Sequence, residues 1–380
     1  MKKLLLSSAA ICGLVAFSAA EAQAQIEVSV GGHTKQYLGW LDQDTDTGVE
    51  ERNFDHLAES ELHFNAVGVA DNGLEYGFHV EMEVDNTDGD DTIEESYLFL
   101  SGDWGRVNVG AEDGSNYLLQ IAAPSADANV DGIRQYIQPV NYELETSTSS
   151  AVADFVDADG FDYDNDETGK DNKVTYLSPI MNGFQAGFSF TPEVGDDLNG
   201  LTGFNEDDEE DDLGSAYEVA LRYEGTFNNV GLALGGGFTH IEVEEDADDD
   251  ADDFQEWNVG LDLDIGAFGL GAIYTQAEGG DSVGGGSFAH FGADAETDTI
   301  VVGADYTTGP FKLGASWFNQ DSEDTFIAGE VETDRYTAGV IYTVAEGLTF
   351  RGSVSHIEHD IEGADDVEAT SVLGGVQFNF

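Results

Sequence analysis

The sequence predicts an all-β fold, a closed, 16-stranded antiparallel transmembrane β-barrel, on three observations. Seven tight turns alternate with eight long acidic stretches, and a strand-like run fills every interval between them. These runs alternate apolar and polar residues with the period of two that is typical of strands. After the N-terminal segment, no run of eighteen apolar residues remains that could form a membrane-spanning helix. Fifteen connections join sixteen strands, and single-chain outer-membrane barrels have even strand numbers with short turns on the periplasmic side and longer loops outside.

The N-terminal segment has the pattern of a cleaved secretory signal peptide. Lys2 and Lys3 precede the apolar residues 4–20, and Ala22-Gln23-Ala24 is a small-x-small cleavage site. We therefore expect residues 1–24 to be removed and residues 25–380 to form one barrel domain. Cys12, the single cysteine, lies in the removed part, so disulfides and cysteine metal sites are excluded.

Each predicted turn carries Gly, Asn or Pro, the residues that tolerate positive φ or preset a turn. The turns are Asp71-Asn72-Gly73, Asp103-Trp104-Gly105, Met181-Asn182-Gly183, Asn228-Asn229, residues 266–269, Thr308-Gly309-Pro310 and Ala345-Glu346-Gly347. The long connections are residues 43–52, 86–91, 112–172, 192–214, 244–253, 278–297, 320–331 and 360–367.

The alternation also predicts which face of each strand meets lipid. In residues 217–223 the odd positions are apolar or aromatic, whereas the even positions hold Glu218, Ala220 and Arg222. A charge on the lipid face costs roughly 2–4 kcal/mol at mid-depth, so the charged face must look into a wet interior. Aromatic residues near strand ends predict girdles at the membrane interfaces: Tyr37, Trp40, Tyr217, Tyr223, Trp257, Tyr274, Trp317, Tyr336 and Tyr342.

The charge balance is strongly acidic, with 78 Asp and Glu against 12 Lys and Arg. This excludes nucleic acid as a partner, because nucleic-acid binding needs a basic surface. Two interpretations remain open: general surface acidity of a protein in salty water, or a surface and passage that attract cations. Acidic runs such as residues 207–212 and 242–253 are predicted to be solvated loop tips.

Several segments, in order, resemble the general diffusion porins of Gram-negative outer membranes, over the whole mature length. They are residues 26–32, the hairpin from Ser60 through Asp71-Asn72-Gly73 to Glu81, residues 104–110, 176–179, 182–184, and the end from Gly375 to Phe380. The resemblance implies a homotrimer of water-filled barrels in a lipid bilayer with lipopolysaccharide, located in the cell outer membrane. It implies passive diffusion of small hydrophilic solutes and ions, no enzymatic activity and no required cofactor. Phe378 and Phe380 resemble the signal read by the barrel-assembly machinery.

The resemblance also implies that the third long loop, residues 112–172, folds inward and narrows the lumen. Residues 117–123 are more apolar than a free surface loop should be, which predicts packing against the inner wall; packing on another external loop is the alternative. The pore-constriction candidates on the loop are Asp127, Asp131, Glu143 and Glu145, with Asp154 as a weaker one. Alternation places Lys35, His63, Glu75, His79, Glu81, Arg106, Arg222 and Arg351 on the lumen face.

The wall departs from the family pattern, because Glu61 and Ala111 stand where relatives often carry arginine. Glu61 is therefore also a constriction candidate. Few wall cations and an acidic loop predict a cation-preferring passage, since rings of Asp and Glu make cation-preferring pores.

Residues 157–167 place oxygen ligands at alternate positions, as calcium sites do. The EF-hand pattern needs Gly at its sixth place, and counting from Asp162 that place holds Glu167. A loose calcium site at Asp157, Asp159, Asp162 and Asp164 remains an alternative to a plain solvated loop.

Evidence for an enzyme is thin. Residues 280–284 match the nucleophile-elbow pattern, but no helical periodicity follows as that motif requires. His356 and His359 lie three apart on a predicted strand, so they point to opposite faces and cannot share a metal. A substrate-specific channel would need an aromatic track or a basic ladder, and alternation shows neither. The non-membrane alternative is a secreted acidic soluble β-protein, such as an adhesin or calcium-binding module.

Overall fold

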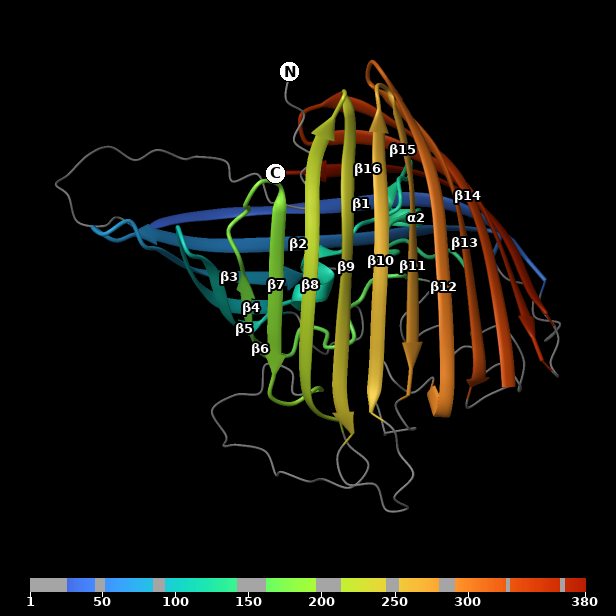
Figure 1. The fold of residues 1–380 in the computed structure, drawn as a ribbon. Coiled ribbons are helices and arrows are strands. Elements are labelled where there is room, and N and C mark those ends of the chain that lie inside the picture. Colours follow the sequence, from blue (N-terminus) through green and yellow to red (C-terminus); the bar gives the residue numbers. More distant parts are fainter. Residues whose placement is uncertain are drawn as a thin grey trace.

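The protein forms a closed barrel of sixteen antiparallel strands (Figure 1), which confirms the predicted fold class. The computed structural model describes residues 26–44, 52–84, 93–141, 162–195, 213–243, 253–279, 291–325, 329–362 and 366–380. Each strand pairs with its neighbours in sequence, and the first strand closes the barrel by pairing with the last, so no edge is left unpaired. The predicted signal peptide, residues 1–24, lies outside the described residues.

The elements are β1 Glu27–Gln43, β2 Phe54–Val69, β3 Glu75–Glu83, β4 Ile93–Gly102, β5 Gly105–Ala111, α1 Ser115–Leu119, α2 Ala128–Asp131, β6 Asn172–Leu177, β7 Phe184–Thr191, β8 Leu213–Phe227, β9 Val230–Val243, β10 Phe254–Ile265, β11 Phe268–Glu278, β12 Phe291–Thr308, β13 Phe311–Thr325, β14 Gly329–Ala345, β15 Leu348–Ile361 and β16 Val367–Asn379. Within the described ranges, no helix is long and apolar enough to cross a membrane.

The tight turns lie where the sequence predicts them. Asn228 and Asn229 both have positive φ, at 49° and 67°, which is the backbone that a two-residue hairpin turn requires. Two long connections are shorter than predicted, because β12 begins at Phe291 and β13 runs to Thr325. Polar hydrogen bonds between β12 and β13 extend this hairpin beyond its apolar part. For example, Thr297 Oγ1 donates to Ser322 Oγ over 3.0 Å.

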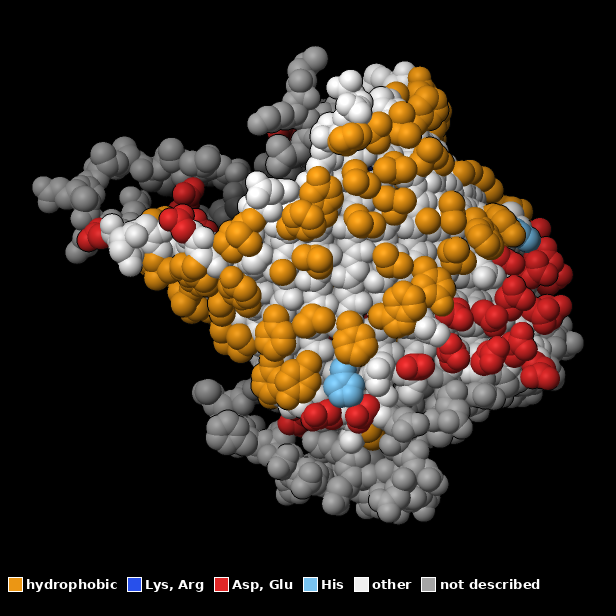
Figure 2. Space-filling model, in the orientation of Figure 1, with side chains coloured by type: hydrophobic (Ala, Val, Ile, Leu, Met, Phe, Trp, Pro, Cys, Tyr) orange, Lys and Arg blue, Asp and Glu red, His pale blue; other side chains and the backbone are white. Residues whose placement is uncertain are grey.

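The outer face of the barrel is apolar. Figure 2 shows hydrophobic side chains over the visible wall, with acidic side chains gathered toward the end of the barrel opposite the tight turns. Aromatic pairs form bands at both ends of the strands, such as Phe184–Tyr223 near the turns and Phe190–Tyr217 near the loops, with ring centroids 4.6 and 5.2 Å apart. One aromatic prediction is wrong: Tyr37 is fully buried and faces inward, because it stands at an odd position of β1 whereas Trp40 faces outward at an even one.

The last strand carries the residues predicted as an assembly signal. The rings of Phe378 and Phe380 stack with centroids 5.6 Å apart, and both side chains are exposed. The backbone of Phe380 exchanges hydrogen bonds with Gly32 of β1. Their recognition by assembly machinery stays a prediction.

The described parts of the third loop lie inside the barrel, which confirms the inward folding. We call L3 the described parts of the connection between β5 and β6, residues 112–141 and 162–171. Its helices lie behind the front strands, within the wall (Figure 1), and α1 contacts β6 to β9. Leu119, Ile121 and Ala123 are buried, so the predicted apolar stretch packs against the inner wall.

Glycines on the lumen face make room for L3. A Cβ at Gly260 of β10 would lie 2.7 Å from the Cβ of Ile121, and one at Gly314 of β13 would lie 2.6 Å from the nitrogen of Ala126. Real Cβ atoms do not approach this closely, so larger residues there would displace the loop. The glycine belt, defined as the lumen-facing glycines that contact L3, comprises Gly187, Gly235, Gly237, Gly260, Gly271, Gly303, Gly314 and Gly339.

Part of the inner wall is dry. Ala123 and Tyr163 of L3 pack into a buried cluster with wall residues that include Val301, Phe318 and Ile357. The wet interior that the sequence predicts does not extend to this side, because L3 packs on the wall there.

Candidate constriction site

Asp127 anchors L3 to the barrel wall. Its Oδ2 accepts a hydrogen bond of 2.6 Å from the Tyr37 hydroxyl, and its Oδ1 accepts one of 2.7 Å from Arg351. The same carboxylate caps α2 by accepting from the backbone N–H of Asn129. Asp127 is 1% exposed, so this is a buried ion pair that joins the loop to β1 and β15.

Asp131, the next loop carboxylate, also faces the wall. It lies at the end of α2, and the Ser316 hydroxyl of β13 donates to its Oδ2 over 3.2 Å. Burial raises the pKa of Asp131 to about 6. The other predicted loop carboxylates, Glu143, Glu145 and Asp154, lie outside the described residues.

L3 carries two cations that the sequence analysis did not single out. Arg134 Nε donates to Asp164 over 3.1 Å and its Nη2 donates to Asp166, while Lys170 pairs with Asp113. Burial would lower the pKa of Lys170, but Asp113 and Asp166 hold it well above its usual value. Their residue type was the signal that could have identified them, because the whole acidic sequence contains only 12 lysine and arginine residues.

Facing L3, the lumen side of β1 to β4 carries a ladder of imidazoles and carboxylates. We call it the His–Glu lattice: His33, Glu59, Glu61, His63, His79, Glu81 and Glu95. The strand register aligns it, since His33 stands opposite Glu61 and His63 opposite Glu81. Lys170 reaches across from L3, with its Nζ 3.5 Å from Glu95 Oε1.

Five of the predicted wall residues gather in this region, because Lys35, Glu61, His63, His79 and Glu81 all take inward positions. Lys35 pairs with Glu59, and its Nζ lies 3.3 Å from the centre of the Tyr136 ring of L3.

The remaining predicted wall residues lie outside the lattice. Arg106 lies on β5, where it stacks 4.0 Å above the Phe99 ring. Arg222 donates to the carbonyl of Gln120 and so holds L3, and Glu75 is exposed at the turn end of β3.

His33, Glu59 and Glu95 are the lattice members that the sequence analysis missed. They share the odd-numbered, inward positions of the residues it did predict. The same alternation was sufficient to find them.

Half of the predicted calcium ligands are described. Asp162 accepts a hydrogen bond from the backbone N–H of Gln135, and Asp164 pairs with Arg134. Asp157 and Asp159 lie outside the described residues, and calcium binding stays a prediction.

The two histidines of β15 point to opposite faces, as predicted. His359 is fully buried, and its Nδ1 forms a hydrogen bond of 2.9 Å with Thr333 Oγ1. His356 is partly exposed, and its Nε2 lies 3.7 Å from Glu368 Oε1. Residues 280–284, which resemble a nucleophile elbow, lie outside the described residues.

A family profile described as Gram-negative porin matches residues 7–362. The chain belongs to the Gram-negative porin family. The family confirms the predicted outer-membrane location, and together with the apolar outer face it speaks against a secreted soluble β-protein.

Solved porins share the fold of this porin at low sequence identity. A porin refined at 1.8 Å resolution superposes with a TM-score of 0.57 at 20% identity, covering 93% of this chain and 100% of that one. The trimer form of OmpT from Vibrio cholerae gives a TM-score of 0.60 at 16% identity, covering 93% and 99%.

Curated relatives include uncharacterized proteins of Rickettsia felis and Rickettsia conorii, 27% and 26% identical over 121 residues. These matches cover 28% of this chain and 27% of each relative.

Proposed function

We propose that this porin forms a water-filled passage through which small hydrophilic solutes and ions cross the outer membrane by passive diffusion, with a preference for cations. The family, the closed barrel and its apolar outer face support a channel. No enzymatic step is needed for this function.

The lumen face of β1 to β4 carries the argument for cations. These four strands are described throughout, and they hold one lysine and no arginine: Lys35, which already pairs with Glu59. Glu61, Glu81 and Glu95 lie beside it on the same wall. Rings of acidic side chains favour cations in pores, and the net charge of −66 raises the local cation concentration around the entrance.

The test is a reversal potential across a planar bilayer in a KCl gradient. We expect a reversal potential whose sign shows that K⁺ crosses faster than Cl⁻. Replacing Glu61 and Glu81 together by Gln should reduce the K⁺ preference. Replacing Glu75 by Gln should leave it nearly unchanged, because Glu75 lies on β3 with Glu81 but outside the lattice. A potential that reports chloride preference in the wild type would overturn the proposal.

We also propose a homotrimer, supported by the family and by the trimer form of the similar OmpT. The mass of the complex extracted in mild detergent tests it, and a monomer mass would overturn it. N-terminal sequencing of the exported protein tests the proposed cleavage, with Gln25 expected as the first residue.

A further inference from the structure

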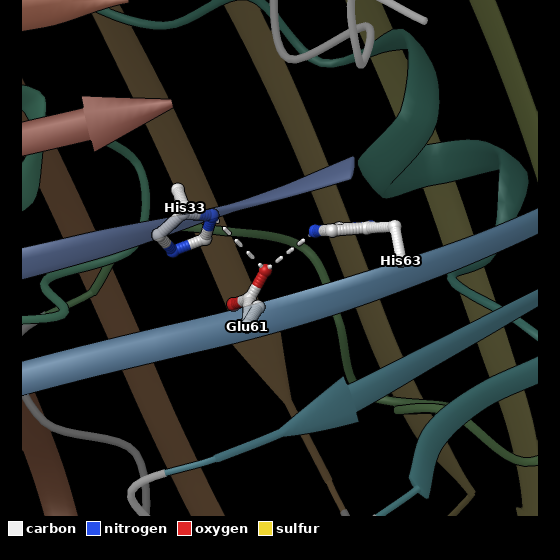
Figure 3. Close-up of side chains that lie close together, drawn as sticks. All are labelled: His33, Glu61 and His63. Atoms are coloured by element: carbon white, nitrogen blue, oxygen red, sulfur yellow. Dashed lines mark ion pairs between the residues drawn. The ribbon is translucent and has the colours of Figure 1, made fainter. Parts of the chain in front are cut away.

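Two imidazoles of the His–Glu lattice converge on one carboxylate oxygen. His33 comes from β1, and Glu61 and His63 come from β2, all on the lumen face (Figure 3). His33 Nδ1 lies 3.4 Å and His63 Nε2 lies 3.2 Å from Glu61 Oε2. The three candidate ligand atoms all lie within 4.8 Å of one another.

These separations match the edges of a tetrahedral metal site. Zinc bonds nitrogen and oxygen at about 2.0–2.1 Å, which places neighbouring ligands of a tetrahedron about 3.3 Å apart. Both measured nitrogen-to-oxygen distances lie close to that value. Two histidines and one carboxylate fill three positions and leave the fourth for water, a ligand set that zinc uses in open sites.

A second layer of carboxylates orients both rings. The Nε2 of His33 lies 2.8 Å from Glu59 Oε1, and the Nδ1 of His63 lies 2.8 Å from Glu81 Oε2. When each far nitrogen donates its proton to that carboxylate, the lone pair of the near nitrogen points toward Glu61. Metal-bound histidines almost always have such a partner, because it fixes the tautomer and raises the basicity of the ring.

We propose that His33, Glu61 and His63 bind a divalent transition-metal ion, with Zn²⁺ the best match, and that the fourth position is open to water of the lumen. Imidazole nitrogen suits zinc, copper and nickel, whereas Ca²⁺ and Mg²⁺ prefer oxygen ligands alone. The three side chains retain between 10 and 16% of their exposure, so ions in the lumen reach them. This site goes beyond passive diffusion, because it would hold one class of ion inside the passage.

A neighbouring triad competes for the same metal. His63, His79 and Glu81 also bring their ligand atoms within 4.8 Å, and the two triads share His63. The Nδ1 of His79 is held by the Asn65 amide oxygen at 2.8 Å, and its Nε2 lies 3.7 Å from Glu81 Oε2, which is longer than either distance in the proposed site. The geometry therefore favours the triad that contains His33.

The first experiment measures zinc binding to the purified full-length porin in detergent, with excess Ca²⁺ to compete with Zn²⁺ at acidic side chains. We expect one tightly bound Zn²⁺ per chain. His33→Gln and His63→Gln should each weaken binding by about tenfold or more, on the scale of changes at metal-site histidine partners. His79→Gln, which removes the competing triad, and His356→Gln, which removes a histidine outside the lattice, should bind like the wild type.

A second probe reports the coordination itself. Co²⁺ in a four-coordinate site gives an intense visible absorption band, whereas octahedral Co²⁺ absorbs only weakly. We expect the intense band in the wild type and its loss in His33→Gln. Circular dichroism checks that each variant keeps the β-barrel. Zinc binding that survives His33→Gln, or that is lost in His79→Gln, would overturn the proposal.

Conductance separates this inference from the proposed channel. Micromolar Zn²⁺ should reduce the current through wild-type channels, because a bound dication adds positive charge to a passage that favours cations, and His33→Gln should be insensitive. A channel that conducts but neither binds nor responds to Zn²⁺ would refute the metal site and leave the channel standing. A barrel that binds Zn²⁺ but carries no current would refute the proposed channel and leave the metal site standing.

Discussion

The two sides of the inner wall follow the same alternation of residues but differ in the side chains that predominate on them. From β7 to β14 the inward positions are rich in glycine and apolar residues, and L3 lies on them. From β1 to β4 they hold imidazoles and carboxylates. Under most of L3, glycines in the wall make room for the loop. On β1 to β4, which L3 contacts at only a few side chains such as Tyr37 and Glu95, the wall keeps charges that ions in the passage can meet.

We expect the residues that dock L3 to set stability and the residues of the His–Glu lattice to set ion selectivity. Docking of L3 rests on buried apolar contacts and on the ion pair between Asp127 and Arg351, so changes there should loosen the loop. Changes in the His–Glu lattice should alter ion preference and leave the loop in place.

The largest effect is expected from Asp127→Asn. The variant leaves the Arg351 guanidinium, whose side chain is 12% exposed, without its charged partner. Removing one partner of a buried ion pair costs about 3–5 kcal/mol. We expect a matching fall in the free energy of unfolding and faster proteolysis within L3.

The double variant Asp127→Asn with Arg351→Gln is the control, because it removes both charges and should recover part of the loss. If Asp127→Asn alone were as stable as the wild type, the anchor would carry no docking energy.

The next largest effect is a pH dependence of folding stability that comes from Asp131. Burial raises its pKa from 3.8 to about 6 in the folded protein, so folding favours the neutral form. The resulting stabilisation is present below the unfolded pKa and is lost as the pH rises through about 6. Asp131→Asn should therefore match the wild type at low pH and exceed its stability at pH 7, by up to about 3 kcal/mol at 1.36 kcal/mol per pKa unit.

Thermal unfolding of both proteins across this pH range is the measurement. Equal differences in melting temperature between variant and wild type at both ends of the pH range would show that the pKa of Asp131 does not change on folding.

Much of this architecture could be predicted from the sequence, and the reason is local. Turn residues such as Asn228 and Asn229 fix hairpins by their own backbone preferences, and alternation fixes which face each residue takes. The same rule brings Glu61, His63 and Glu81 together, because cross-strand neighbours follow from the register of a hairpin.

The features that the sequence did not predict depend on the path that L3 takes inside the barrel. Asp127 and Arg351 are 224 positions apart, and no periodicity tells which wall residue a loop carboxylate meets. Tyr37 was assigned to the outer girdle as an aromatic residue near a predicted strand end, although its odd position faces the lumen. Mid-strand glycines such as Gly260 were a visible signal for docking, because an inward position without a side chain needs something else to fill it.

A smaller effect is expected from filling the glycine belt. At Gly303 of β12 an added Cβ would meet the backbone of Pro124, and overpacking of this kind costs about 1–3 kcal/mol. Gly303→Ala should lower stability and raise single-channel conductance as L3 moves away from its seat. Gly374→Ala on β16 is the matched control, because nothing lies within 4 Å of its added Cβ. Equal effects of the two substitutions would contradict the close fit of L3.

The smallest effect is expected from Lys312→Gln, at the turn end of β13 and outside both the glycine belt and the His–Glu lattice. Lys312 Nζ lies 3.0 Å from Asp305 Oδ2 near the turn end of β12 and β13, and the lysine side chain is 37% exposed. Such pairs contribute about 0–1 kcal/mol, so unfolding should hardly change. The loss of one positive charge near that end should increase the K⁺ preference by less than Glu61→Gln reduces it, because Glu61 faces L3 where the passage is narrowed. A larger shift of the reversal potential from Lys312→Gln than from Glu61→Gln would place the selective charges at the turn end and remove the distinction between the two sides of the wall.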